Sequence, residues 1–385
     1  MHRAATWDSD DLALLWSKFV AQESFRLCVY GLVLVDTQMA APCNTRPLLS
    51  ISEVIWDIPP SSHIWDASSA DEWVVLVLEE IQDCTILTST TPADHVLHLT
   101  HVTQSLMSGS ASRRLLDRVS ACPLATVCVL AALDSLVRDF TYCYYQMPPV
   151  LPDPSAYHVL SPAQNRPINA AINTLLDTVR KDIITSAQLT RLSRLMAWTV
   201  RLGLSEPDDL LVAGIADTSL TAGLATTAHC ILGSAVAKRR GMASTRRLFA
   251  QDSSMTAWED LLKSVTLVHE SVEDSSCHQA PWMTALSYRV LLLLWRTLRR
   301  AIAELEEASS ATSGAGSFSP AGTLTSLVCE KVRSLLNDEN AKPDPRDSRA
   351  IEAGFLSLLA QLFDKITNPV GIAISNILCE IGDML

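Results

Sequence analysis

The first part of the chain repeats apolar side chains at the spacing of an α-helix. Over residues 8–35, mostly apolar positions recur at steps of three and four, and Asp8, Ser9 or Asp10 can cap the start of the helix. These positions are Leu12, Trp16, Phe19, Glu23, Leu27, Tyr30 and Leu34. Prolines then punctuate residues 41–69, which we expect to form an extended loop because proline lacks the N–H that a helix needs.

The pattern predicts further helices before the middle of the chain. A short helix restarts near Asp71, and a longer one opens at Pro92 and runs to about Met107. Residues 124–146 are almost continuously apolar, which predicts a helix that is buried on most of its faces.

A proline-rich stretch, residues 148–167, is the expected connection between two helical parts of the chain. The N-terminal part comprises residues 1–147 and the C-terminal part residues 168–385. Long helices are expected in the second part at roughly 168–202, 206–237, 255–273 and 280–307. A Ser/Gly/Ala-rich segment at about 308–321 predicts a disordered insertion, and two or three helices close the chain.

Composition favours helices throughout. Leu, Ala and Ser dominate, only 13 glycines occur, and alternating β-branched runs are scarce. Apolar residues make up 48% of the chain, which is enough to bury a sizeable core. The sequence therefore predicts an all-α fold, an irregular multi-helix bundle with Pro/Ser-rich loops.

The balance of charge argues against direct contact with nucleic acid. The formal net charge is −12, and an acidic surface repels phosphate, so we expect this chain alone to bind DNA poorly. The first residues lack the apolar core of a signal peptide. The longest apolar stretches are shorter than the ~20 residues that a membrane span needs, so we expect no membrane partner.

Motifs of catalysis and metal binding are scarce. The ten cysteines contain no CxxC pair, which makes a structural zinc site improbable, and we expect most of them to be buried thiols in a reducing compartment. No phosphate-binding loop, GxSxG or HExxH motif occurs, so we expect no enzyme, no catalytic residue and no cofactor site. The alternative is a helical enzyme that uses magnesium or a histidine-bound metal.

Three histidines are the best metal candidates. His95, His98 and His101 are spaced by three, which keeps them on one side of a helix, where they could share a zinc or copper ion. The simpler interpretation is a half-exposed helix with polar positions, because no nearby cysteine or carboxylate cluster completes the site.

A two-part basic cluster surrounds Gly241. It could act as a nuclear import signal, or it could be a basic helix C-terminus that the helix dipole favours. Its members are Lys238, Arg239, Arg240, Arg246 and Arg247.

Glu23 and Arg26 can pair on the first helix because they are three residues apart. An exposed pair of this kind contributes only ~0.3–0.5 kcal/mol. In a buried pair, the loss of one partner could cost ~3–5 kcal/mol.

An ordered set of residues runs through the first seventy or so positions. The order is Trp16, Glu23-Ser24, Arg26, Tyr30, Asp36, Asn44-Thr45-Arg46-Pro47, Ser52-Glu53, Pro59, Trp65-Asp66-Ala67 and Glu72-Trp73. This set resembles the centre of the fungal-specific transcription factor domain, also called the middle homology region, in the variety associated with two-Cys, two-His zinc fingers. Two positions depart from that pattern: Phe25 precedes a single arginine, and Pro60 stands where a cysteine is usual.

The resemblance implies an all-α regulatory domain of a nuclear RNA polymerase II transcription factor, with no catalytic residue. Its implied partners are transcriptional co-regulators or a homologous factor, and a small-molecule effector is an open alternative. It also implies a zinc-dependent DNA-binding module, which would hold the only zinc and make the only DNA contact. No cysteine precedes Cys28, so we expect that module to be absent from this chain. The alternative function is a helical protein-binding adaptor, or a degenerate regulator, without DNA binding.

Overall fold

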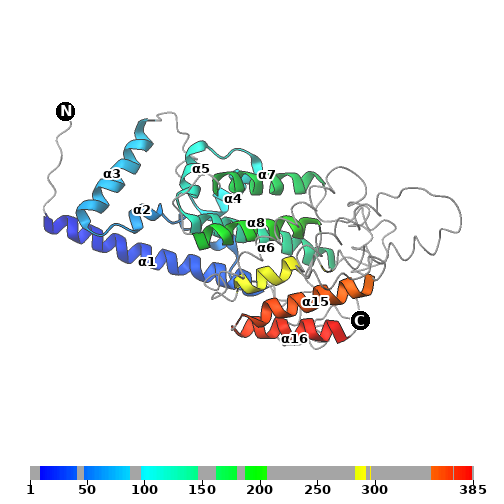
Figure 1. Cartoon of the computed structure of the whole chain (residues 1–385). Helices are drawn as coiled ribbons and strands as arrows, with labels where there is room; N and C mark the ends of the chain where they lie inside the picture. Colours follow the sequence, from blue (N-terminus) through cyan, green and yellow to red (C-terminus); the bar gives the residue numbers. More distant parts are fainter. Residues whose placement is uncertain are drawn as a thin grey trace. The chain divides into compact units, whose positions relative to one another are not determined.

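The computed structural model describes part of the 385-residue chain. The described residues are 9–40, 47–86, 97–145, 162–179, 187–205, 282–291, 295, 348–366 and 368–383. Within these ranges the secondary structure is helical, with no strand and with an isolated antiparallel bridge between Asp57 and His98. The all-α prediction is confirmed (Figure 1).

Backbone contacts divide the chain into two compact units. Unit 1 comprises Met1–Gln38, Arg46–Cys143 and His158–Arg201. Unit 2 comprises Met39–Thr45, Tyr144–Tyr157 and Leu202–Leu385. The connection that we expect between two helical parts falls largely on residues 146–161, outside the described ranges, so that division of the chain stays a prediction.

Unit 1 begins with one long helix, α1 (Ser9–Ala40), which confirms the helix predicted over residues 8–35 and extends it. The expected extended loop, where the structure describes it, contains two short helical turns, η1 (Ile51–Glu53) and α2 (Ser62–Trp65). The next helix, α3 (Ala70–Ile86), begins near the predicted position but is 17 residues long rather than short.

The fourth helix, α4 (Leu99–Ser108), begins later than the sequence suggests. Two residues that we expected to be helical, Leu97 and His98, are extended instead. The carbonyl of Leu97 accepts a hydrogen bond from the backbone N–H of Ile58 (2.9 Å), and His98 forms the bridge with Asp57. This pairing with a segment forty positions earlier overrides the helical pattern. Gly109 (φ +68°) ends α4 in the left-handed conformation that glycine adopts easily.

The helix predicted over residues 124–146 is present as α6 (Pro123–Tyr145), and most of its described side chains up to Val137 are buried. It follows α5 (Arg113–Ser120), whose start is capped by Ser112, because the Ser112 hydroxyl accepts a hydrogen bond from the Leu115 N–H (3.2 Å). Among the described helices, no single one is long and apolar enough to span a membrane, although α5 and the first part of α6, bent by 107°, pass that test as a pair.

Helix α7 (Pro162–Val179) begins within the proline-rich stretch. The prediction of a loop through residue 167 is therefore wrong for residues 162–167. Pro162 occupies the first helical position, where its missing N–H has no partner to lose. Pro167 lies inside the helix and removes one backbone hydrogen bond. Packing offsets this loss, because Ile168, Ala171, Ile172 and Leu175 are almost completely buried.

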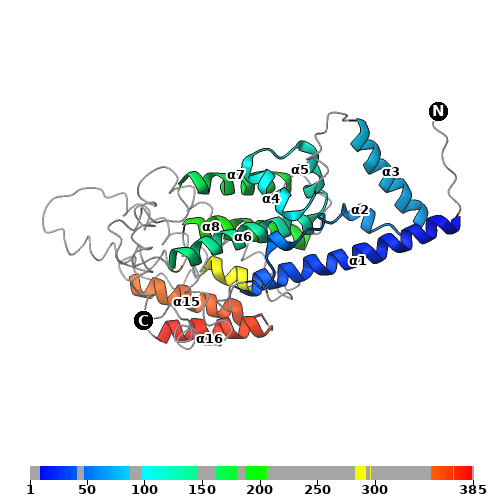
Figure 2. The ribbon, with the colours of Figure 1, turned by 180° about the vertical axis from the view of Figure 1, so that it is seen from behind.

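A second helix, α8 (Ala187–Ser205), lies in the range where the pattern predicts a single helix over 168–202. The residues between α7 and α8 are outside the described part. Helices α4 and α5 both pack against α7 (Figures 1 and 2).

Unit 2 is described for one segment and two helices. Residues 282–291 are helical, and α15 (Ser348–Asp364) and α16 (Pro369–Asp383) form a packed helical pair. The rings of Tyr288 and Phe363 meet edge to face with centroids 5.9 Å apart. The Trp295 indole donates a hydrogen bond to the buried Glu352 carboxylate (2.9 Å).

Helices α15 and α16 lie where two or three closing helices are predicted, and α16 buries one apolar face at Ile374, Ile377, Leu378 and Ile381. Asn368 caps that helix, because its side-chain oxygen accepts a hydrogen bond from the Gly371 N–H (2.9 Å). The helices predicted at 206–237 and 255–273 and the insertion predicted at 308–321 lie outside the described residues.

Candidate functional site

The ordered set of residues found in the sequence lies largely on α1 and on the segment that follows it. One face of α1 is turned toward the rest of unit 1, and its members recur at every seventh position, Trp16, Glu23, Tyr30 and Thr37. Trp16 is half-buried, and the other three are buried. This inward face therefore carries polar groups into the core of the unit, where each of them needs a partner.

Glu23 and Arg26 form the buried type of pair rather than the exposed type. An Arg26 Nη1 atom lies 2.7 Å from Glu23 Oε1, and the side chains are 19% and 4% exposed. Burial raises the pKa of the Glu23 carboxyl above its usual value of 4.5, while the charges of Arg26 and then Arg118 lower it and that of Asp57 raises it further. Arg26 is thus the group that most opposes this rise in the pKa of the buried carboxyl.

The charges continue from α1 to two other helices. Arg118 on α5 makes an ion pair with Glu80 on α3, and both side chains are partly buried. Burial lowers the pKa of Arg118, and the nearby Cys122 and Glu23 oppose that shift. Alternating charges therefore connect α1, α3 and α5 within unit 1.

The segment between α1 and α2 is held against α1 by three residues of this helix. The Tyr30 hydroxyl donates a hydrogen bond to the Trp56 carbonyl (2.8 Å), and the Asp36 carboxylate accepts one from the Leu49 N–H (2.7 Å). The rings of Phe25 and Trp56 are in contact, with centroids 5.0 Å apart. Tyr30 and Asp36, which the sequence analysis singled out by their order alone, thus have a common structural role.

The last part of the ordered set starts α3 and ties it to α1. The Glu72 carboxylate accepts hydrogen bonds from the Ser68 N–H (2.8 Å) and hydroxyl (2.6 Å), and these bonds lower the pKa of Glu72. Ser69 in turn accepts a hydrogen bond from the Glu72 N–H (3.2 Å). The Trp73 ring lies 5.2 Å from that of Phe19 on α1.

The remaining residues of the set have simpler surroundings. Pro59 is buried, Pro47 is half-buried, and Trp65 is 38% exposed. Residues 44–46 and the basic cluster, Lys238, Arg239, Arg240, Arg246 and Arg247, lie outside the described part of the chain.

His98 and His101 do not lie together on one helix. His98 immediately precedes α4, with extended dihedral angles (φ −63°, ψ 142°), whereas His101 is inside that helix. The Nδ1 atom of His98 lies 3.2 Å from a carboxylate oxygen of Asp57, which belongs to the bridge described above. His95 lies outside the described residues, so the shared metal ion itself is not tested. In the described ranges, no group of three or more His, Cys, Asp or Glu side chains could hold a metal ion.

The expectation that most cysteines are buried holds for two of the four whose side chains the structure describes. Cys122 and Cys128 are buried, whereas Cys28 and Cys379 are exposed, and all four are free thiols. Burial raises the pKa of the Cys122 and Cys128 thiols, which keeps both protonated and unreactive at neutral pH.

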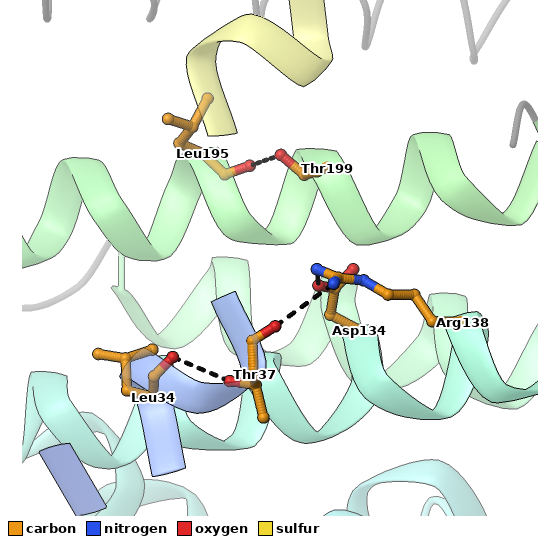
Figure 3. A network of polar contacts seen from close by, with 6 residues as sticks. All are labelled: Leu34, Thr37, Asp134, Arg138, Leu195 and Thr199. Carbon is orange, nitrogen blue, oxygen red and sulfur yellow. Dashed lines mark hydrogen bonds and ion pairs between the residues drawn. The ribbon is translucent and has the colours of Figure 1, made fainter. Parts of the chain in front are cut away.

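A buried polar network joins α1 to α6, and the sequence analysis missed it (Figure 3). Arg138 forms an ion pair with Asp134, and it also donates a hydrogen bond to the Thr37 carbonyl (3.3 Å). Asp134 and Arg138 are 3% and 6% exposed. The signal in the sequence was an acid and a base four positions apart within an otherwise apolar helix, a spacing that places the two side chains side by side.

The side of α1 opposite the inward face carries exposed apolar side chains, among them Phe25 and Leu32, each 61% exposed. The region built by the ordered set is therefore largely polar on its inner side and apolar on its outer side, and two of its buried polar atoms, Glu23 Oε2 and Trp73 Nε1, have no hydrogen-bond partner. Such an arrangement suits contact with another macromolecule better than bond-making chemistry.

Fold and site thus define a class, an all-helical domain whose distinctive residues hold α1, the following segment and α3 together. No protein-family model matches the chain, and no solved structure matches it. Two curated fungal proteins are similar to part of it. A transcription factor of Zymoseptoria tritici is 32% identical over 72 residues, which are 19% of this chain and 7% of that protein. Transcription factor 1 of Elsinoe fawcettii is 31% identical over 67 residues, 17% of this chain and 7% of that protein.

Proposed function

We propose that this chain is a regulatory region of a fungal transcription factor and acts in the nucleus through contacts with other proteins. The observation that carries the proposal is the likeness of about seventy residues to two fungal proteins that are named as transcription factors. The matched part is a small fraction of each relative, 7% of its length. The proposal therefore concerns a regulatory role and leaves the relatives' other activities aside.

Charge supports a division of labour. A protein that binds DNA directly neutralises phosphates with Lys and Arg, but this chain has 42 acidic against 30 basic side chains. In the proposal, sequence-specific DNA recognition belongs to a zinc-finger module outside these 385 residues, and zinc is bound there. The partners of this chain are transcriptional co-regulators or a homologous factor.

The contacts of the ordered residues support a binding role rather than a catalytic one. Glu23, Tyr30 and Asp36 are each committed to a partner within unit 1, so they stabilise a surface instead of presenting reactive groups to solvent. This chain therefore catalyses no reaction in our proposal. Its regulatory activity requires that α1, the segment between α1 and α2, and α3 fold together.

A tethering experiment tests the regulatory role. The full chain is fused to an unrelated DNA-binding domain, and a reporter gene with the matching site is measured in a filamentous fungus. We expect transcription to change several-fold in either direction. Tyr30→Phe, which removes the hydrogen bond to Trp56, should reduce the effect, whereas the matched control Tyr288→Phe removes a hydroxyl from unit 2 that has no hydrogen-bond partner.

Two results would overturn the proposal. A fusion that leaves the reporter unchanged, together with retention of the unfused chain in the cytosol, would favour the adaptor without a transcriptional role. Tight, salt-sensitive binding of the unfused chain to duplex DNA would contradict the division of labour.

A further inference from the structure

The outward face of α1 has the spacing of a coiled-coil seam. Its positions follow one another at steps of four and three, which average 3.5 residues, the repeat that keeps one face of a helix against a partner helix. We call these positions the seam: Leu14, Lys18, Ala21, Phe25, Cys28, Leu32 and Val35. All of them are exposed in the chain by itself.

The seam and the inward face lie on opposite sides of the helix. Tyr30, for example, falls midway between Cys28 and Leu32 in sequence, two residues from each, which places it about 160° away around the helix axis. The inward face already packs within unit 1, whereas the largest seam residues, Leu14, Phe25 and Leu32, are 54%, 61% and 61% exposed.

The segment between α1 and α2 widens this surface. Ile55, which is 67% exposed, adjoins Trp56, the residue that contacts Phe25. Leu48 (91% exposed) and Leu49 (39% exposed) adjoin the C-terminal half of the seam through the bond between Leu49 and Asp36. A whole large apolar side chain offers ~150 Å² of surface, so the exposed parts of the seam and of this segment together offer about 600 Å². A stable dimer buries ~800 Å² on each partner, and this apolar surface makes up most of that area.

We propose that a second copy of this chain covers the seam, with the two α1 helices antiparallel across a two-fold axis. In this register Phe25 lies opposite Cys28 of the second copy, and Leu32 lies opposite Ala21 of the second copy. Large residues then meet small ones, which is the arrangement that fills a helix interface without voids. A two-fold axis produces each of these contacts twice.

The charges of the seam also select this orientation. Lys18 is exposed within the seam, and in the antiparallel register it lies opposite Val35 of the second copy. The neighbouring Asp36 of the second copy then attracts the positive charge of Lys18. A parallel pair would instead place the two Lys18 side chains against each other inside an apolar interface. The N-terminal half of α1 offers exposed Leu14 and Leu15 to the second copy's Leu48, which adjoins the C-terminal half of its seam.

This dimer goes beyond the proposed function and does not depend on it, because it follows from the surface of unit 1 alone. The test is the mass of the full chain in solution by analytical ultracentrifugation at micromolar concentration. We expect twice the chain mass of 42.0 kDa. Leu32→Asp should shift the protein to monomer, with a dissociation constant at least 100-fold weaker, because a carboxylate would be buried between the helices.

The matched control is Val75→Asp on α3, which is 53% exposed and lies outside the seam, so it should remain a dimer. Circular dichroism confirms that both variants keep their helices. A monomeric wild-type chain, or a Leu32→Asp variant that is helical and still dimeric, would overturn the proposal.

Orientation is tested by a covalent link. Phe25→Cys should form an intermolecular disulfide with Cys28 of the second copy under mild oxidation, and adding Cys28→Ala should abolish it. Trypsin cleaves after Arg26, which separates the two positions, so an antiparallel dimer joins two different peptides. Linked identical peptides would show a parallel pair and would contradict the antiparallel register.

Discussion

The ion pair between Asp134 and Arg138 allows a sharp test of the packing between α6 and α1. The perturbation is Arg138→Met, which keeps the length of the side chain and removes its charge. Asp134 (3% exposed) would then be buried without Arg138, and the Thr37 carbonyl would lose its donor. Breaking a buried pair costs about 3–5 kcal/mol, and the lost hydrogen bond adds about 1 kcal/mol.

The matched variant replaces both partners, Asp134→Leu with Arg138→Met. Buried pairs exchanged for apolar residues of similar volume are often neutral or stabilised by ~1–4 kcal/mol, so the double variant should recover most of the loss. The assay is urea unfolding followed by circular dichroism, with the midpoint and slope compared among the three proteins. A single variant within about 1 kcal/mol of wild type, or a double variant as unstable as the single one, would refute a buried charge pair at this position.

Four further substitutions test other parts of the structure. Gly371→Ala should destabilise the α15–α16 pair by about 1–3 kcal/mol, because its new Cβ would lie 2.7 Å from the Ile366 carbonyl oxygen. Gly382→Ala meets nothing within 4 Å in the same helix and should be neutral or slightly stabilising in a thermal melt. Because the pKa of Glu23 is raised, the folded state binds the proton of the Glu23 carboxyl more tightly than the unfolded state does. The free energy of unfolding should therefore fall as the pH rises above 4.5, the ordinary pKa of this group. Glu23→Gln should remove that part of the slope in unfolding measured against pH, and an unchanged slope would show that Glu23 does not titrate there. Tyr30→Phe should cost about 1 kcal/mol and expose the Trp56 segment to faster hydrogen exchange, and unaltered exchange would contradict its anchoring role.

Much of the fold followed from local pattern. The periodicity of residues 8–35 and the apolar run of residues 124–146 each predicted a helix that the structure contains. The pattern failed where a distant segment decides, as at His98, which is extended because the backbone pairs with Asp57 and Ile58. The pattern also predicted that proline would keep residues 162–167 out of a helix, but α7 begins at Pro162 and contains Pro167.

The candidate site was predictable in its members but not in its contacts. The order of Glu23, Tyr30 and Asp36 marked them as related, yet two of their partners are the backbone groups of Trp56 and Leu49, and such groups leave no trace in a sequence. The seam was visible only in part, because a spacing of three and four on α1 describes two opposite faces. Exposure, which depends on the whole fold, was needed to tell them apart.

The hydrogen bond between Ile58 and Leu97 has a consequence for the tolerance of the chain to insertions. It joins the two ends of the segment 59–96, which contains α2 and α3, so this segment is a closed loop of the chain. The entropic free-energy cost of closing such a loop grows slowly, by about 0.6 kcal/mol for each doubling of its length. Related chains can therefore differ widely in length between α3 and Leu97 while α4 still begins at the same place.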